Sequence, residues 1–364
     1  MKKILATVLA LVMALALCTT SWADGVKPIT AEMTGLDTGS YELTGDVTLT
    51  AGALTVKSGA IVTLDLGTFT LTNKAGEHTI VNNGTLTITG TGTVDNVSHA
   101  RAALFNNEGA TAVLNGGSFT RSQENGKTKE DSGNNSFYTI QNLGTMTINA
   151  GVSVTQNGCF SSMVANGYYN GTGKTNTPTM IINGGTFSGG LNTVKNDDCG
   201  VMTINGGEFK NFAQACVQNH NKLTITNGNF DGSELKAIAD STVSVIYNCG
   251  CGADNDKGML SISGGTFSGG KEETYVICDV STVSEAYTDI SGGTFTKGSA
   301  TMIGKTASAK VAISGGAFKD AAGKAVDVSA YLAAGKQQNS DGSVGNKSYY
   351  YYPSTSDTTT STTT

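Results

Sequence analysis

Two acids and a histidine have the spacing needed for acid–base chemistry across stacked layers. Asp197 and Asp198 are adjacent, and His220 lies at the equivalent place in the following repeat. If successive repeats stack, a carboxylate and an imidazole on neighbouring layers could act as general acid and base. The structural alternative is a pair of solvated acids at a corner of the chain beside a surface histidine.

Four aromatic residues suggest a second kind of chemistry, the stacking of rings on the apolar faces of sugars. They are Phe137, Tyr138, Tyr168 and Tyr169. Tyr168 and Tyr169 lie in the insertion 167–178, which is rich in Gly, Asn and Thr, and they form the candidate ligand-binding site. We interpret Phe137 and Tyr138 more simply, as the beginning of a strand.

Six cysteines follow the first 23 residues, an even number that permits disulfides without defining their pairing. Cys249 and Cys251 are separated by one residue, which suits neither a zinc knuckle nor a redox pair. Cys216 and Cys278 stand beside strand positions and are interpreted as small buried side chains. We therefore expect no metal site and no cofactor.

A repeat positions these residues: an aliphatic side chain stands five places before a phenylalanine, with turn residues between them. In the copy at 200–209, Met202 and Ile204 alternate with polar residues, which is the period of a strand with one buried face. Seven copies have this form: Leu114/Phe119, Ile182/Phe187, Ile204/Phe209, Ile225/Phe230, Ile262/Phe267, Ile290/Phe295 and Ile313/Phe318. Three copies are degenerate: Leu66/Phe69, Ile88/Val94 and Ile148/Val154. A fixed unit with variable insertions predicts a solenoid.

A second short repeat, an aliphatic residue followed two places later by asparagine, lies between the first ones. Its asparagines are Asn82, Asn106, Asn142, Asn166, Asn196, Asn219 and Asn248, and the next copy has Asp279. If the units stack, these amides form a ladder along the solenoid, as they do in cross-β stacks. We assign them a structural role and not a ligand-binding one.

The composition agrees with many short strands joined by tight turns. The chain of 364 residues has 48 Gly, 3 Pro and only 14% charged residues. Its formal charge is −6, and its only arginines are Arg101 and Arg121. We therefore expect no binding to nucleic acid, because such binding requires basic patches.

The sequence divides into five segments. Residues 1–23 have the charged start, apolar run and small residues of a secretory signal, and the apolar run is short for a membrane span. Residues 24–75 are expected to form capping coils, 76–335 the repeats and 336–348 the end of a cap. Residues 349–364 are a Ser/Thr-rich linker or stalk, expected to be disordered for lack of apolar residues.

Two features near the ends qualify this division. Cys18 raises the alternative of a lipid anchor, but Leu17 stands where a lipoprotein signal has a small residue. Near the other end, Asp327 or Ser329 can start a helical turn and Gly335 can end it. We therefore expect a short helical plug, and we expect no membrane span after the leader.

The strand at 41–49, that at 59–69 and the later units of the type LTINGGTF resemble right-handed parallel β-helix proteins of the pectate-lyase-like superfamily. More narrowly, the chain is similar to exported repeat proteins on the surface of Gram-positive bacteria. The resemblance covers residues 40–345 and implies an all-β, right-handed parallel β-helix of about ten coils. Enzymes of this fold use clustered acids with calcium, or several aspartates with a histidine and an Arg-x-Lys pair. This chain lacks the Arg-x-Lys pair.

Three functions remain open. The leading expectation is a secreted or cell-surface protein without enzymatic activity, an adhesin-like rod that contacts extracellular glycans or a host surface. The second is a polysaccharide lyase or glycoside hydrolase that uses Asp197, Asp198 and His220. The third is a glycan-binding module that uses Tyr168 and Tyr169. Fold alone does not choose among them.

Overall fold

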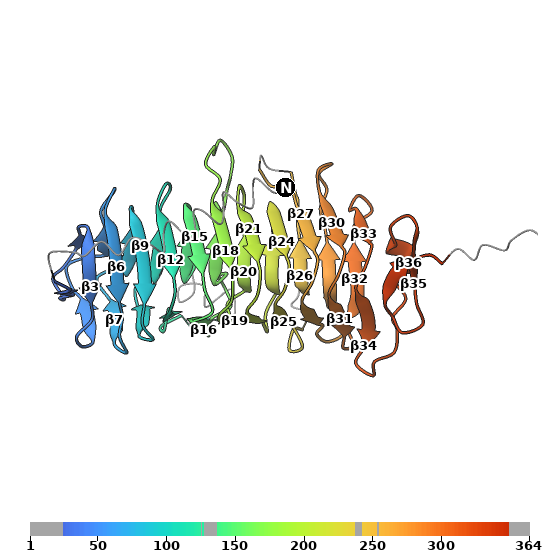
Figure 1. Ribbon diagram of the computed structural model, residues 1–364, viewed down its shortest axis with the longest axis horizontal. Helices are drawn as coiled ribbons and strands as arrows, with labels where there is room; N and C mark the ends of the chain where they lie inside the picture. The colour runs from blue at the N-terminus through green and yellow to red at the C-terminus, as the bar shows by residue number, and fades with distance from the viewer. Residues whose placement is uncertain (1–24, 125, 127–136, 237–241, 253–254, 349–364) are drawn as a thin grey trace, which may run out of the picture.

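The computed structural model describes residues 25–124, 126, 137–236, 242–252 and 255–348. The predicted signal sequence, residues 1–23, and the predicted linker, residues 349–364, lie outside the described residues. The rest forms a rod of stacked coils that runs from blue to red in Figure 1. Within the described part, no helix is long and apolar enough to span a membrane.

Each coil contributes one strand to each of three parallel sheets, which we name after the residue that recurs in them. The Asn sheet has the order β2 (Gly35–Leu36), β5 (Leu54–Val56), β8 (Ile80–Asn82), β11 (Leu104–Asn106), β14 (Ile140–Asn142), β17 (Val164–Asn166), β20 (Asn192–Asn196), β23 (Ala215–Asn219), β26 (Ser244–Asn248), β29 (Tyr275–Asp279) and β32 (Thr301–Lys305).

The Ile sheet follows the Asn sheet in each coil. Its order is β1 (Lys27–Pro28), β3 (Gly39–Glu42), β6 (Ile61–Asp65), β9 (Thr85–Thr89), β12 (Thr111–Leu114), β15 (Thr145–Ile148), β18 (Thr179–Ile182), β21 (Val201–Ile204), β24 (Lys222–Ile225), β27 (Met259–Ile262), β30 (Tyr287–Ile290) and β33 (Val311–Ile313).

The Phe sheet completes the coil. Its strands in chain order are β4 (Val47–Leu49), β7 (Thr70–Asn73), β10 (Thr93–Asn96), β13 (Gly117–Thr120), β16 (Val152–Gln156), β19 (Thr186–Gly189), β22 (Glu208–Lys210), β25 (Asn229–Asp231), β28 (Thr266–Ser268), β31 (Thr294–Lys297) and β34 (Ala317–Asp320). The predicted all-β parallel β-helix is confirmed, with two sheets of 11 strands and one of 12.

Like side chains stack in register through the rod. Ile204 pairs with Ile225, and Phe209 pairs with Phe230. Six phenylalanine rings, from Phe187 to Phe318, lie face to face with centroids 4.6–4.9 Å apart and planes within 7° of parallel. This spacing is the separation of neighbouring strands, so the backbone ladder sets the distance between the rings.

Toward the N-terminus the column contains both aliphatic side chains and a ring. Val154 pairs with Phe187, and Phe119 has Val94 and Val154 as its neighbours. The predicted degenerate copy Leu66/Phe69 was wrong in register, because Leu71 pairs with Val94 and occupies the column. A shift of two residues keeps the same face of a strand inward, so alternation did not fix the register, and Phe69 was mistaken for the side chain in the column.

The two positions of each Gly-Gly turn require glycine for different reasons. Gly207 has a φ of 114°, in the region that favours glycine, and a Cβ there would lie 3.2 Å from the Phe209 ring. A Cβ on the first glycine of another copy, Gly264, would lie 2.2 Å from the carbonyl oxygen of Thr226 on the preceding coil. The pair thus allows both the turn and the close stacking of coils.

The asparagines form a continuous buried ladder. Asn82, Asn106, Asn142, Asn166, Asn196 and Asn219 each donate from Nδ2 to the Oδ1 of the following rung at 2.7–2.9 Å. Asn248 donates to Asp279 Oδ2 at 3.1 Å. Every bond points toward the C-terminus, so the last rung need only accept. This direction explains why Asp279 replaces asparagine there.

The C-terminal end of the rod contains little helix. A 3-10 turn spans Ser329–Tyr331, and the Ser329 N–H donates to Asp327 Oδ1 at 2.8 Å. The antiparallel strands β35 (Lys336–Gln338) and β36 (Val344–Asn346) complete this end, at the right of Figure 1. The helical part of the expected plug is thus one short turn, followed by a hairpin that the sequence did not indicate.

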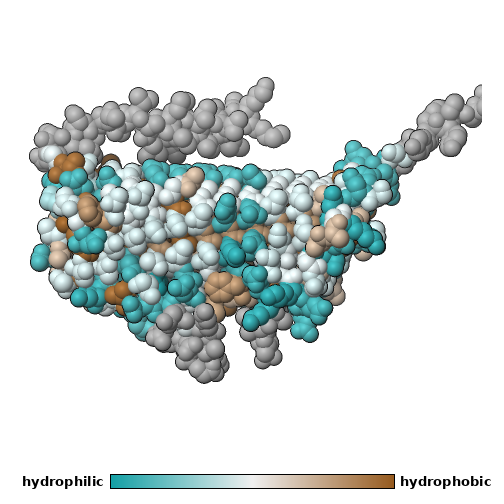
Figure 2. Space-filling model, turned by 90° about the horizontal axis from the view of Figure 1, so that it is seen from below, coloured by the Kyte–Doolittle hydropathy of each residue, from teal (hydrophilic) through white to brown (hydrophobic). Residues whose placement is uncertain are grey.

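Most of the face shown in Figure 2 is hydrophilic or intermediate in hydropathy, with scattered apolar residues. The described chain exposes four large apolar side chains: Val26, Ile61, Phe160 and Tyr169. Two of these lie in one groove, which is described below.

Candidate functional site

The two adjacent acids at the end of β20 point into different surroundings. Asp197 Oδ1 lies 2.8 Å from Lys195 Nζ, and its Oδ2 accepts the Tyr138 hydroxyl at 3.0 Å. Asp198 Oδ2 instead accepts the backbone N–H of Gly171 at 2.8 Å. Burial and the nearby charge of Asp197 raise the pKa of Tyr138, which keeps its hydroxyl protonated as a donor.

Asp198 and His220 do come together, and Asp256 joins them. One ligating atom of each lies within 4.8 Å of those of the others. Asp198 is 6% exposed and Asp256 5%. Burial raises the pKa of Asp198, and the charge of Asp256 adds to this effect. Because both carboxylates are buried and Asp197 lies elsewhere, the predicted set of three is divided and is poorly accessible to a polymeric substrate.

Tyr168 and Tyr169 also separate. Tyr168 is 6% exposed, its hydroxyl accepts Asn176 Nδ2 at 3.1 Å, and Lys174 Nζ lies 4.7 Å from its ring centroid. Its backbone pairs with that of Asp198. Tyr169 is 82% exposed, with Lys195 Nζ 5.5 Å from its ring centroid. Of this predicted pair, only Tyr169 offers a ring to a ligand.

Tyr169 belongs to a groove on the outer side of the Asn sheet, which we call the aromatic groove. It has a volume of about 310 Å³ and is lined by Phe137, Tyr138, Phe160, Ser161, Ser162, Tyr169, Leu191 and Lys195. Phe137 and Tyr138 precede β14 and present their rings to this groove. They contribute to the candidate site, which the simpler interpretation of them had not included.

The ring contacts continue from the groove toward the N-terminus. Phe137 and Tyr138 have centroids 5.5 Å apart, and His78 lies 5.5 Å from Phe137. His78 stacks on Phe105 at 4.7 Å. Rings from neighbouring coils therefore form a row along the rod, a geometry suited to an elongated ligand.

His78 makes this region sensitive to acid. Its Nδ1 accepts the backbone N–H of Ala102 at 2.8 Å, which requires the neutral ring. Burial, helped by the charges of Arg101 and Arg121, lowers the pKa of His78 from 6.5 to about 4.

We therefore expect the folded state to lose stability as the pH falls from 6.5 to about 4. The folded pKa is below the unfolded one, so the contribution is complete above pH 6.5 and is lost on acidification. With allowance for solvent screening the loss should be about 2 kcal/mol. Urea unfolding across this range should show it in the wild type and not in His78→Gln. An equal loss in both would contradict the assignment, and the exposed His99, replaced by Gln, is the control.

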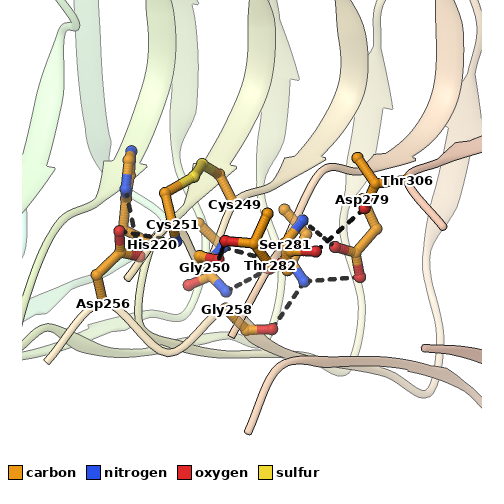
Figure 3. The surroundings of a disulfide bond; sticks show 12 residues. His220, Cys249, Gly250, Cys251, Asp256, Gly258, Asp279, Ser281, Thr282 and Thr306 are labelled. Atoms are coloured by element: carbon orange, nitrogen blue, oxygen red, sulfur yellow. Dashed lines mark hydrogen bonds and ion pairs between the residues drawn. A yellow bond between two sulfur atoms is a disulfide. The ribbon is translucent and has the colours of Figure 1, made fainter. Parts of the chain in front are cut away.

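A disulfide shapes the loop that carries Asp256. Cys249 and Cys251 are bonded, and Figure 3 shows them between Asp256 and the following coil. The Cys251 N–H donates to Asp256 Oδ2 at 3.0 Å, and the Gly250 N–H donates to Ser281 Oγ at 2.8 Å. Sequence reasoning had left the cysteine pairing open.

Asp256, Phe160 and Lys195 were not predicted from the sequence as site residues. Asp256 lies in an insertion without repeat register, so no periodic signal marked it. Phe160 precedes β17 in a similar irregular segment. Lys195 could have been found from the short repeat, in which it stands between the aliphatic residue and the asparagine. Neighbouring side chains of a strand point to opposite faces, so this middle residue faces outward wherever the asparagine faces inward.

The chain matches no protein-family model, no curated protein and no solved structure.

Proposed function

We propose that this chain is an exported, non-enzymatic β-helical protein, secreted or held at the cell surface, that binds extracellular glycans through the aromatic groove. The supporting observation is the Tyr169 ring, which is 82% exposed at the edge of a groove that contains three further aromatic side chains. Solvent-facing rings of this kind are suited to the apolar faces of sugars.

The polar groups of the groove suit the same ligand. Ligand sites combine apolar walls with a few fixed polar groups. Here Lys195 is held by Asp197 at 2.8 Å, and Asp197 also accepts the Tyr138 hydroxyl. Lys195 and Ser162 both line the groove and can bond to sugar hydroxyls.

Export rests on residues 1–23, with their charged start and apolar run. The Cys249–Cys251 disulfide supports an oxidising compartment. We place the protein with the pectate-lyase-like β-helices and, among them, with the surface repeat proteins of Gram-positive bacteria. In this proposal the rod carries the groove and provides no catalysis.

Glycan-array binding of the chain after residue 23 tests the proposal. We expect a subset of glycans to bind, and we expect Tyr169→Ala and Phe160→Ala each to weaken binding about tenfold, a loss of about 1.4 kcal/mol of stacking. Ile61→Ala is the matched control, because Ile61 is an exposed apolar side chain on β6, outside the groove.

Any of three outcomes would overturn the proposal. The first is glycan binding that Tyr169→Ala and Phe160→Ala leave unchanged, and the second is the absence of binding to any glycan. The third is the release of shortened or unsaturated products from a polysaccharide, which would make the protein an enzyme.

A further inference from the structure

Asp198, His220 and Asp256 converge from three successive coils. They follow β20, β23 and β26, at the corner where each strand of the Asn sheet ends. Their ligating atoms lie within 4.8 Å of one another, and His220 Nδ1 is 3.5 Å from Asp256 Oδ1. Figure 3 shows the imidazole and this carboxylate facing each other beside the disulfide.

The cluster contains buried polar atoms without hydrogen-bond partners. Asp256 is 5% exposed, and its Oδ1, which faces His220, accepts no hydrogen bond. His220 Nε2 is also buried and has no hydrogen-bond partner. Buried polar groups are normally paired, and an unpaired one costs free energy. The ring nitrogen that faces Asp256 is Nδ1, so the unpaired Asp256 Oδ1 is the atom that indicates a missing ligand between the two side chains.

The charges of the three side chains indicate that the ligand is a cation and what charge it carries. Two carboxylates carry −2 when ionised, and one imidazole supplies at most +1. Each carboxylate has one backbone donor, Gly171 for Asp198 and Cys251 for Asp256, which orients it and leaves the other oxygen available. A divalent cation would balance the charge and accept all three free ligand atoms.

We propose that Asp198, His220 and Asp256 bind one zinc ion, with water completing its coordination. An imidazole nitrogen and carboxylate oxygens are ordinary zinc ligands, whereas calcium prefers sites made of oxygen alone. Ligands 2.0–2.1 Å from a tetrahedral ion are about 3.3 Å apart, so small side-chain rotations would bring the three groups to the metal. The expectation of no metal was based on cysteine spacing, and this site uses no thiolate.

The ion would hold the corner loops onto the rod. The Cys199 N–H donates to the Asn255 carbonyl at 3.0 Å, which joins the Asp256 loop to the Asp198 corner. The Tyr168 N–H donates to the Asp198 carbonyl at 3.0 Å, which joins the insertion that carries Tyr169 to the same corner. Zinc would thus link three coils and two loops.

The test is zinc binding by the chain after residue 23, stripped with a chelator and titrated with Zn²⁺ alone. We expect one zinc per chain by calorimetry and by metal analysis after gel filtration, with a raised Tm that Ca²⁺ does not reproduce. Asp256→Asn and His220→Ala should weaken binding at least tenfold. His99→Ala, at an exposed histidine on a distant coil, should bind as the wild type does.

A wild-type chain that takes up no zinc, or His220→Ala and Asp256→Asn chains that bind it as tightly as the wild type, would overturn the site. If both variants fail to fold, the visible absorption spectrum of Co²⁺ added to the wild-type chain tests the site instead. Visible absorption bands of a four-coordinate site with nitrogen and oxygen ligands support the proposal, and the spectrum of octahedral aqueous Co²⁺ refutes it. Glycan binding is measured separately, so either proposal can fail alone.

Discussion

Replacing Asn166 by aspartate should destabilise the rod by about 3–5 kcal/mol, although the two side chains have nearly the same shape. Asn166 Nδ2 donates to Asn196 Oδ1 at 2.9 Å, to Val201 O at 3.2 Å and to Pro178 O at 3.3 Å. Its Oδ1 accepts Asn142 Nδ2 at 2.7 Å. A carboxylate would place a buried acceptor against three acceptors.

The effect should depend on pH in a defined direction. An ionised carboxylate is disfavoured at this buried site, so its folded pKa would lie above the unfolded value near 3.9. The folded state then binds the proton more tightly, and the destabilisation of Asn166→Asp should grow as the pH rises above about 4. Urea unfolding at several pH values measures it.

The other end of the ladder supplies the matched control. Asp279 accepts from Asn248 Nδ2, from Thr288 Oγ1 at 2.6 Å and from the Ser281 N–H at 2.9 Å. Asn248 and Thr288 both donate to Oδ2, whereas the Ser281 N–H donates to Oδ1. Asn in its place keeps the first two bonds when its Oδ1 takes the position of Oδ2, and it then loses the bond from the Ser281 N–H, toward which its Nδ2 is turned. We expect Asp279→Asn to cost about 1–2 kcal/mol, clearly less than Asn166→Asp, because it leaves one donor without an acceptor and buries no new charge. Equal losses from both substitutions would show that the ladder has no direction.

Removing one ring from the middle of the phenylalanine column should cost about 3–5 kcal/mol in Phe209→Ala. Phe209 is 1% exposed and stacks on Phe187 at 4.9 Å and on Phe230 at 4.8 Å. Both contacts are lost, and the strand ladder prevents the coils from closing the cavity. Phe209→Leu should cost about 1–2 kcal/mol, because Val94 and Val154 occupy the same column in earlier coils.

Phe69→Ala is the control for this prediction, since Phe69 is only partly buried and lies outside the column. It should cost about 1 kcal/mol. Repeat rods can open in parts, so hydrogen exchange should accompany denaturant unfolding. We expect faster exchange in the strands around β22 in Phe209→Ala. A loss as small as that of Phe69→Ala would contradict the packing role of the column.

The regular part of the molecule could be predicted because the sequence pattern that specifies each coil is short and recurs along the chain. Ile204 and Phe209 stand in a pattern that recurs, so one assignment of the inward face applies to every coil. The ladder follows in the same way, since Asn196 and Asn219 occupy one position in successive units. The prediction failed where a copy was degenerate, at Phe69, and where no repeat applied, at the terminal hairpin.

The sequence by itself therefore determined the rod, its columns of Ile and Phe, and its line of amides. Only the tertiary structure decided which neighbours share a site. Asp197 and Asp198 are adjacent in the chain, yet one holds Lys195 and the other faces His220. The physical reason is that side-chain direction at a corner depends on the backbone of the loops packed against it. Those loops differ in length and have no period from which to infer it.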